Sequence, residues 1–425
     1  SFQTAETSDF RKVFEKLYGV SLERFFHDWT ERNGHPQLKI KTTYQADEGF
    51  VKVEVEQTQK EEAFHFPLTI ELTNTDDSGQ PTKITPFLKE KKQTFLIPVK
   101  QRPELVRIDP DFTLLAEIDE EKSRSWWAAQ LMRAPSVPER LRAVEHFGKS
   151  HETADQALLI ECLEKDDFYA VRAEIAKVLG KKKNEECRKA LLVGTQQSDP
   201  RVRRACVAAL SHFESDALVE TKLKEKHNQG DPSYYVEAEI VDALAKITKT
   251  PDWELLTSSL KKDSHRDVIR TKALDGLARC SDVEALNTIT EWTKHGHSRT
   301  ARMAAMNALA SSLKRHQFPK AKQTACVKLL SEYLDEPGPR IRRAAIQALA
   351  EIPQFAKDEK GQIATMAEHD ADGRVRVAAE AAVKKFEQTQ SSSSQVQKLQ
   401  TELQQLKDQY KKIEEKLKQL ETKKQ

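Results

Sequence analysis

Few residues in this 425-residue sequence have the types and the spacing that catalysis or metal binding requires. A zinc peptidase would use a His-Glu-x-x-His helix, whose histidines hold the metal and whose glutamate is the general base. His151 and Glu152 begin such a run, but Asp155 stands where the second histidine is needed. His295 and His297 could bind a metal, but no acidic or thiol partner is close in sequence, so we expect a loop there. The sequence predicts no catalytic, cofactor-binding or metal-binding residue, and it has neither a Gly-rich phosphate loop nor a Gly-x-Ser-x-Gly elbow.

Clustered arginines are the other candidates for ligand binding. They stand in three groups: Arg201/Arg203/Arg204, Arg340/Arg342/Arg343 and Arg374/Arg376. A row of such groups would suit phosphates or an acidic peptide. The alternative, which we favour, is a structural ladder of Asp–Arg pairs with the remaining charge in solvent. The 69 basic and 67 acidic residues give a net charge of +2, which argues against a nucleic-acid partner.

Cysteine usage and hydropathy bear on the compartment. The five cysteines are far apart, and each lies in a segment with helical periodicity: Cys162, Cys187, Cys206, Cys280 and Cys326. An odd count without a close pair argues against disulfides or a thiolate metal site, and we expect buried small hydrophobes. This weakly favours the cytoplasm and leaves the compartment open. No apolar run approaches the roughly 18 residues of a membrane span, and Ser1, followed directly by a helical pattern, looks like the cut edge of a longer protein.

A repeated pattern organises residues 119–387. Its clearest copy is SDPRVRRACVAALSHF (198–213), a helix start followed by an apolar stripe at three- and four-residue spacing. The last large apolar position of each copy recurs every 31 to 40 residues, at Phe147, Leu179, Leu210, Leu244, Leu277, Leu309, Leu349 and Val383. A second amphipathic segment precedes each copy, so each unit is expected to be two antiparallel helices. This period predicts an α-α superhelix, or solenoid.

The pattern resembles HEAT-type repeats, because the Asp-Pro-x-Val-Arg-like start and the Ala/Leu stripe occur together. The resemblance implies a ladder in which an Asp of the turn pairs with an Arg early in the second helix. The matching pairs are Asp199 with Arg203, Asp267 with Arg270 and Asp372 with Arg376. Asp231 is expected to lack such a partner, because Glu237 occupies the Arg position, and the ladder should be interrupted at that unit.

The first 118 residues follow a different plan. Residues 1–36 predict two helices, the first burying Phe10, Val13, Phe14 and Leu17 and the second burying Leu22, Phe25, Phe26 and Trp29. Between residues 37 and 118 the period changes to two, as in LKIKTTY and FVKVEVEQTQ. Alternating apolar and polar residues between turn signals predict a small antiparallel β-sandwich.

This part resembles the zinc aminopeptidases of the aminopeptidase N (M1) kind. The matching residues, in order, are Phe25, Phe26, Trp29, Gly34, Pro36, Gln57, Gln59, Phe64, Phe66 and Pro67. The resemblance implies that residues 1–36 are the last helices of a thermolysin-like catalytic domain, and that zinc is bound only elsewhere in the parent protein. It also implies a C-terminal superhelix that walls the active site and gates access for peptides or unfolded segments. Because this chain lacks the zinc motif, we expect no hydrolysis by it alone; the alternatives are a catalytically dead scaffold or a HEAT-repeat protein-binding module.

The last residues change composition abruptly. Residues 388–395, including SSSSQ, predict a flexible polar linker, and residues 396–425 carry four heptads. The seam of those heptads is Val396, Leu399, Leu403, Leu406, Tyr410, Ile413, Leu417 and Leu420. In a parallel pair of helices Glu402 would face Lys407, and Lys416 would face Glu421. We therefore expect a homodimeric coiled coil; a helix folded back on the repeats and a trimer are the alternatives.

Overall fold

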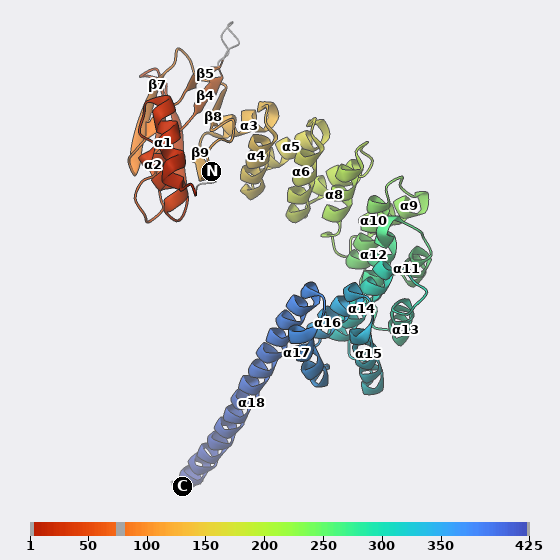
Figure 1. Cartoon of the computed structure of the whole chain (residues 1–425). Coiled ribbons are helices and arrows are strands. Elements are labelled where there is room, and N and C mark those ends of the chain that lie inside the picture. The colour runs from red at the N-terminus through yellow and green to blue at the C-terminus, as the bar shows by residue number, and fades with distance from the viewer. Residues whose placement is uncertain (1–3, 74–80, 423–425) are drawn as a thin grey trace. The chain divides into compact units, whose positions relative to one another are not determined.

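The computed structural model describes residues 4–73 and 81–422, and within its last helix it leaves out the side chains of residues 390–401, 408 and 411–422 (Figure 1). The fold is mainly helical, with a small β region near the N-terminus and a long stretch of helical repeats. It divides into two compact units, Ser1–Ala190 and Leu191–Gln425, called the first and second unit below.

The chain begins with α1 (Thr7–Tyr18), which Gly19 ends with a left-handed backbone at φ 69°. After a short connection, α2 (Glu23–Phe26) continues into one π-helical turn, η1 (His27–Glu31). The predicted buried stripe of α1 is wrong: no residue of α1 is buried, and Phe10, Val13 and Leu17 are 59, 65 and 72% exposed. Phe25 is 52% exposed as well. The period of a helix shows which residues share a face, but it carries no information on what covers that face.

The β region contains a four-stranded sheet in the order β7-β2-β1-β9. Its strands are β1 (Gln37–Gln45), β2 (Phe50–Gln57), β7 (Lys92–Pro98) and β9 (Glu117–Glu121). The alternation along β2 places Val51, Val53 and Val55 in the core, as the period of two predicted. The expected antiparallel arrangement holds for β1–β2 and β2–β7, whereas β9 pairs with β1 in parallel. Side-chain alternation determines the faces of a strand but is the same for parallel and antiparallel neighbours, so the alternation could not predict this parallel pair.

A second sheet has the order β5-β4-β8, formed by Thr82–Ile84, Ile70–Thr73 and Leu105–Ile108. The short strands β3 (Phe66–Pro67) and β6 (Phe87–Leu88) form a separate pair. The core of this region takes residues of both larger sheets and also Trp126 from the first repeat helix, whose indole N–H donates to the carbonyl of Pro103 at 2.8 Å. The first helical repeat is thus anchored in the β core.

Helical repeats complete the first unit. They are α3 (Arg124–Arg133), α4 (Val137–Lys149), α5 (Thr153–Lys165) and α6 (Tyr169–Lys182), followed by α7 (Glu185–Gly194), which crosses into the second unit. Successive helices pack on one another, α3 on α4 and α5 on α6, and α4 also packs on α6 of the next repeat. This is the antiparallel-pair arrangement that the repeat period predicted.

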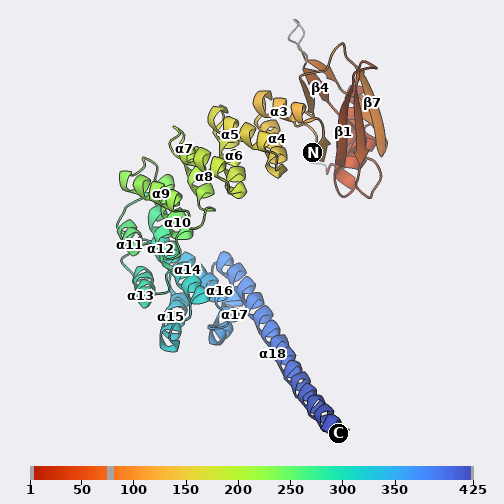
Figure 2. The same cartoon turned by 180° about the vertical axis from the view of Figure 1, so that it is seen from behind.

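The described residues of the second unit continue the pattern in helices α8 to α18, the last of which is much longer than the others. The helices are α8 (Pro200–Leu210), α9 (Ala217–Gln229), α10 (Tyr234–Ile247), α11 (Trp253–Leu260), α12 (Val268–Leu277), α13 (Val283–Trp292), α14 (Arg299–Arg315), α15 (Lys320–Glu332), α16 (Pro339–Glu351), α17 (Lys360–His369) and α18 (Gly373–Thr422). The even-numbered helices from α8 to α18 lie side by side (Figure 2). Small residues such as Ala273, Ala304 and Ala344 are buried along this row. All five cysteines are buried and none of them forms a disulfide, as predicted, and burial raises the pKa of the Cys162 and Cys187 thiols to about 11.

The expected linker at residues 388–395 is wrong, because α18 runs through it without interruption from Gly373 to Thr422. The segment contains no Gly or Pro, and Ser and Gln cost only a few tenths of a kcal/mol in a helix, so strong helix formers on both sides carry the helix across. Most seam residues of the expected coiled coil lie outside the described side chains; Leu403, Leu406 and Tyr410 are 54, 62 and 67% exposed. In the described part of the chain, no helix combines the length and the apolar character of a membrane span.

Candidate functional site

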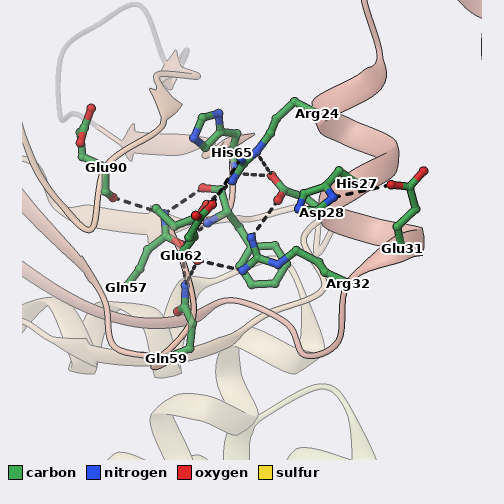
Figure 3. Close-up of polar contacts among 12 residues, drawn as sticks. Arg24, His27, Asp28, Glu31, Arg32, Gln57, Gln59, Glu62, His65 and Glu90 are labelled. Carbon is green, nitrogen blue, oxygen red and sulfur yellow. Dashed lines mark hydrogen bonds and ion pairs between the residues drawn. The ribbon is translucent and has the colours of Figure 1, made fainter.

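Gln57 and Gln59, two of the residues that carry the peptidase resemblance, belong to a buried polar cluster (Figure 3). At its centre the carboxylate of Asp28 is 1% exposed. It accepts hydrogen bonds from Arg24 Nε at 3.0 Å, from Arg32 Nη1 at 2.9 Å and from the backbone N–H of His65 at 2.9 Å. A buried charge that is paired in this way is compensated within the protein.

Gln57, at the end of β2, fastens the loop that follows it. Its side-chain amide donates to the carbonyl of Phe64 and accepts from the N–H of the same residue, both at 2.9 Å, and it also accepts from Gln59 Nε2 at 3.0 Å. The ring of Phe64 packs against Trp29, with centroids 5.6 Å apart, and the guanidinium of Arg32 lies 3.6 Å from its centroid. The hydrogen bonds of Asp28 and of the Gln57 amide thus join η1 to the loop that follows β2 and hold it against the β region.

A second buried network joins the sheet to the repeats. Arg107 on β8 pairs with Glu71 of β4 at 2.5 Å and takes Glu139 of α4 in a two-pronged contact at 2.6 and 2.7 Å. Nearby, Lys122 bonds Glu120 at 2.7 Å and Gln130 at 2.5 Å, and burial lowers the pKa of this lysine. The sequence did not indicate this network, because charged residues at these strand positions usually face solvent.

The cavity beside this network has a volume of about 550 Å³ and lies between the β1–β9 edge and helices α3 and α4. His146 stacks on Trp127 at its wall, 4.4 Å between ring centroids, and burial lowers the pKa of that histidine. Charged groups at the rim pair within the chain, as Glu117 does with His35 at 3.2 Å and Glu145 with Lys149 at 2.8 Å. We find no nucleophile with an adjacent base among the described lining residues.

The metal candidates of the sequence do not meet. His151 and Glu152 precede α5, and Asp155 is held by Arg124 at 2.5 Å and by Ser150 at 2.6 Å. His297 stacks on Trp292 in the loop between α13 and α14, as the predicted loop position requires. Over the described residues, no three His, Cys, Asp or Glu side chains gather as ligands would.

The Asp–Arg ladder exists, but its register differs from the expected one. Arg203 donates to the carbonyls of Gln197 and Ser198, at 2.9 and 2.7 Å, and pairs with Asp231 of the next repeat at 2.7 and 2.9 Å. The prediction that Asp231 lacks an arginine partner is therefore wrong. Each such arginine, which we call a rung arginine, closes the end of one helix and reaches forward to the next turn.

The same geometry recurs along the chain. Arg140 pairs with Asp166 at 2.9 Å, Arg302 with Glu336 at 2.5 Å, and Arg342 with Asp370 at 2.8 Å. Hydrogen bonds from Arg342 lower the pKa of Asp370. At the fourth unit Glu237 takes Lys262 at 3.3 Å in place of an arginine rung.

Two of the predicted pairs are wrong and one is right. Asp199 and Asp372 hold the arginine two residues ahead of each, Arg201 at 2.7 Å and Arg374 at 2.9 Å, instead of Arg203 and Arg376. Asp267 does pair with Arg270, at 2.8 Å. The rung arginines reach across repeats because their side chains project toward the next turn, a direction that sequence spacing does not specify.

A third feature is a small arginine-lined cavity of about 280 Å³ in the second unit, which we call the arginine pocket. It lies where the first turns of α14, α16 and α18 meet, and its lining includes Arg299, Met303, Arg340, Arg343, Asp372 and Arg374. Asp372 pairs with Arg374, and this hydrogen bond lowers the pKa of Asp372 to about 2. Of the arginines clustered in the sequence, Arg203 and Arg342 are rung arginines, whereas Arg340, Arg343 and Arg374 line the arginine pocket.

Comparison with known proteins supports the repeat assignment. Residues 156–225 match the family model for HEAT repeats, which is a minor part of the chain. The comparison with curated protein sequences gives no match.

Two solved structures resemble the chain distantly. The crystal structure of Legionella pneumophila aminopeptidase A in complex with aspartic acid is 13% identical, with a TM-score of 0.48, and the match covers 89% of this chain and 52% of that one. The structure of human deoxyhypusine hydroxylase in complex with glycerol is 20% identical, with a TM-score of 0.27, and the match covers 62% of this chain and 95% of that one. The chain spans about half the length of the aminopeptidase, and likenesses at these values transfer no activity.

Proposed function

We propose that this chain is a non-catalytic scaffold of a peptidase-like protein, in which helical repeats support and restrict a site located outside the chain. The observation that carries the proposal is the cluster of Figure 3. Residues singled out by resemblance to zinc aminopeptidases, among them Trp29, Gln57, Gln59 and Phe64, contact one another there and lock the helices to the β region. Residues used together for architecture support a shared fold rather than a shared reaction.

Zinc does not fit the described residues. A catalytic zinc needs three protein ligands, and in the nearest sequence candidate His151 precedes α5 while both oxygens of Asp155 are used by Arg124 and Ser150. We therefore assign no catalytic step to this chain. In the proposed parent protein, an aminopeptidase of the aminopeptidase N kind, the repeats would wall the active site and admit short peptides or unfolded segments.

Hydrolysis of aminoacyl chromogenic substrates tests this proposal. The 425-residue chain and the product of the complete gene are assayed side by side, with zinc and with a chelator. Chelator-sensitive activity in the gene product and none in the chain is the expected result. Activity in the chain itself would contradict the proposal, and inactivity of both with zinc supplied would favour the dead-scaffold alternative.

A HEAT-repeat protein-binding module is the second candidate, and the family match at residues 156–225 favours it. Such repeats expose long surfaces on which partners dock. Co-purification of a partner by a chain whose gene product is inactive would select this candidate over the peptidase one.

We also propose that the seam of α18 forms a parallel homodimeric coiled coil. Support comes from the heptad pattern and from the exposure of Leu403, Leu406 and Tyr410, which would leave an apolar strip in water on a single helix. Light scattering is expected to give the dimer mass for the natural chain and for Gln405→Glu, a change outside the seam, and the monomer mass for Leu406→Glu. A monomer mass for the natural chain at micromolar concentration would refute the dimer.

A further inference from the structure

The arginine pocket carries more positive charge than the described chain neutralises. Four arginines and one aspartate line it, and the aspartate, Asp372, is already paired with Arg374 at 2.9 Å. Within the described residues, Arg299, Arg340 and Arg343 have neither an ion pair nor a hydrogen bond from their side chains. The Nε of Arg343 is buried without a partner. Because a buried donor without an acceptor is costly, this atom calls for an explanation.

Helix dipoles make the arrangement less favourable still. Arg299, Arg340 and Arg374 lie in the first turns of α14, α16 and α18, where the partial positive charge of a helix repels a cation. The same sequence position in α8 is neutralised, since Asp199 caps the helix and pairs with Arg201 at 2.7 Å. At α16 the equivalent residue is Gly338, which has no side chain to offer.

Steric exclusion does not account for the missing carboxylate. The backbone of Gly338 has φ −80° and ψ 115°, and that of Asp199 has φ −78° and ψ 121°. A Cβ added at Gly338 would meet nothing within 4 Å. An aspartate would therefore fit at residue 338 and would compensate the charge of Arg340. The glycine at this position leaves Arg340 without a carboxylate.

We propose that the arginine pocket binds an oxyanion carried by a segment of a partner protein, either a phosphorylated residue or a carboxylate. The planar guanidinium donates two parallel hydrogen bonds to phosphate or carboxylate oxygens, which is the chemistry that the open arginines supply. A cavity of about 280 Å³ admits one such group with its neighbouring atoms. The partly buried side chain of Met303 provides an apolar wall for the chain that carries it.

The charge distribution favours a protein segment over nucleic acid. A nucleic-acid surface extends along the backbone, but the other arginine group of the second unit is neutralised: Arg201 by Asp199, Arg203 by Asp231 and Arg204 by Glu239. The described lining of the pocket contains no aromatic ring on which a base could stack. This inference depends on the pocket alone and stands whether or not the chain belongs to a peptidase.

Fluorescence anisotropy with the whole 425-residue chain tests the proposal. Three labelled peptides share one neutral, flexible sequence and differ at a central residue, which is phosphoserine, glutamate or serine. We expect the phosphoserine peptide, the glutamate peptide or both to bind, and the serine peptide to bind at least about tenfold more weakly, because charge-assisted hydrogen bonds are lost. The charged peptide that binds more tightly identifies the source of the oxyanion.

Matched variants locate the binding. Arg340→Ala with Arg343→Ala should weaken binding by about ten- to a hundredfold, and Gly338→Asp, which supplies an internal carboxylate, should weaken it by about tenfold. Arg201→Ala removes an exposed arginine at the same helix position of α8 and should change binding by less than about twofold. Three results would overturn the proposal. They are a loss of peptide affinity in Arg201→Ala equal to that in the Arg340/Arg343 variant, equal affinity for all three peptides, and no binding of any peptide at low salt. If a single-stranded oligonucleotide binds more tightly than the peptides and they cannot displace it, the ligand of the pocket is nucleic acid, and the proposal is wrong.

Discussion

The enclosed arginines and the pocket arginines show how one residue type serves two purposes. Arg107, Arg203 and Arg342 each have carboxylates within 2.9 Å and lie mostly out of solvent. Arg299 and Arg340 stand in the first turns of α14 and α16, and Arg343 follows in the next turn of α16, but the described chain gives these three arginines no carboxylate. The difference lies in the neighbouring turn, which supplies an acid in one case and a serine or a glycine in the other. An enclosed arginine stabilises the fold, whereas an open one remains available to a ligand.

Arg107→Ala should produce the largest effect on stability. The change leaves Glu71 and Glu139 facing each other in a buried site, and removal of one partner from a buried ion pair costs about 3–5 kcal/mol. Urea unfolding followed by circular dichroism measures this loss. Arg340→Ala, which changes a pocket arginine that has no carboxylate partner, should alter the free energy of unfolding by no more than about 0.5 kcal/mol. A comparable loss in both variants would remove the distinction between the two sets.

Arg342→Ala should cost about 1–3 kcal/mol. It removes the contacts with Asp370 at 2.8 Å and the hydrogen bonds to the carbonyls of Glu336 and Pro337. Arg343→Ala changes the adjacent residue, which belongs to the pocket, and serves as the matched control. If Arg343→Ala is the more destabilising variant in urea unfolding, the distinction between rung arginines and pocket arginines is wrong.

The rung should also be visible in the pH dependence of unfolding. Hydrogen bonds from Arg342 lower the pKa of Asp370 in the folded chain below its ordinary value of about 3.9. The stability from this shift is complete above about pH 4 and disappears as the pH falls through the lower folded value. The difference in stability between the natural chain and Arg342→Ala is thus expected to shrink below pH 4. A difference that stays constant from pH 7 to pH 3 would show that the rung acts without its charge.

Gly338→Asp should give Arg340 a carboxylate, in the way that Asp199 at the N-cap of α8 pairs with Arg201. We expect a gain of about 0.5–1 kcal/mol, because an aspartate caps the helix, complements its dipole and pairs with Arg340. Gly338→Asn, which caps without a negative charge, separates the contribution of the charge. Unfolding midpoints of the two variants give the comparison, and a lower midpoint for the aspartate than for the asparagine would contradict it.

Local sequence patterns predict much of the fold. The predictions fail where the outcome depends on what packs against a segment or on the residues that flank it. The period of two placed Val51, Val53 and Val55 in the core, and the repeat period placed the paired helices. The period of α1 predicts a buried apolar stripe, yet Phe10 and Leu17 are largely exposed. The serine-rich composition of residues 388–395 predicts a linker, yet the helix continues through this segment.

The candidate site shows the same division at the level of single residues. Sequence spacing brought the arginine groups to notice, but it assigned Arg203 to Asp199 when the structure gives it Asp231, 28 residues away. It could not place Arg299 beside Arg340 and Arg374, which come from three different repeats. The buried pairing of Arg107 with Glu139 had no signal in the sequence at all.

By itself, the sequence determined most helices and strands, which residues share a face, and the repeat, because these depend on interactions between residues a few positions apart. The tertiary structure alone decided which carboxylate faces which arginine and where none does. Those choices depend on the offset between stacked repeats, a distance that no local period encodes. The arginine pocket exists because three helix starts, far apart in the chain, meet at one place without bringing enough acid with them.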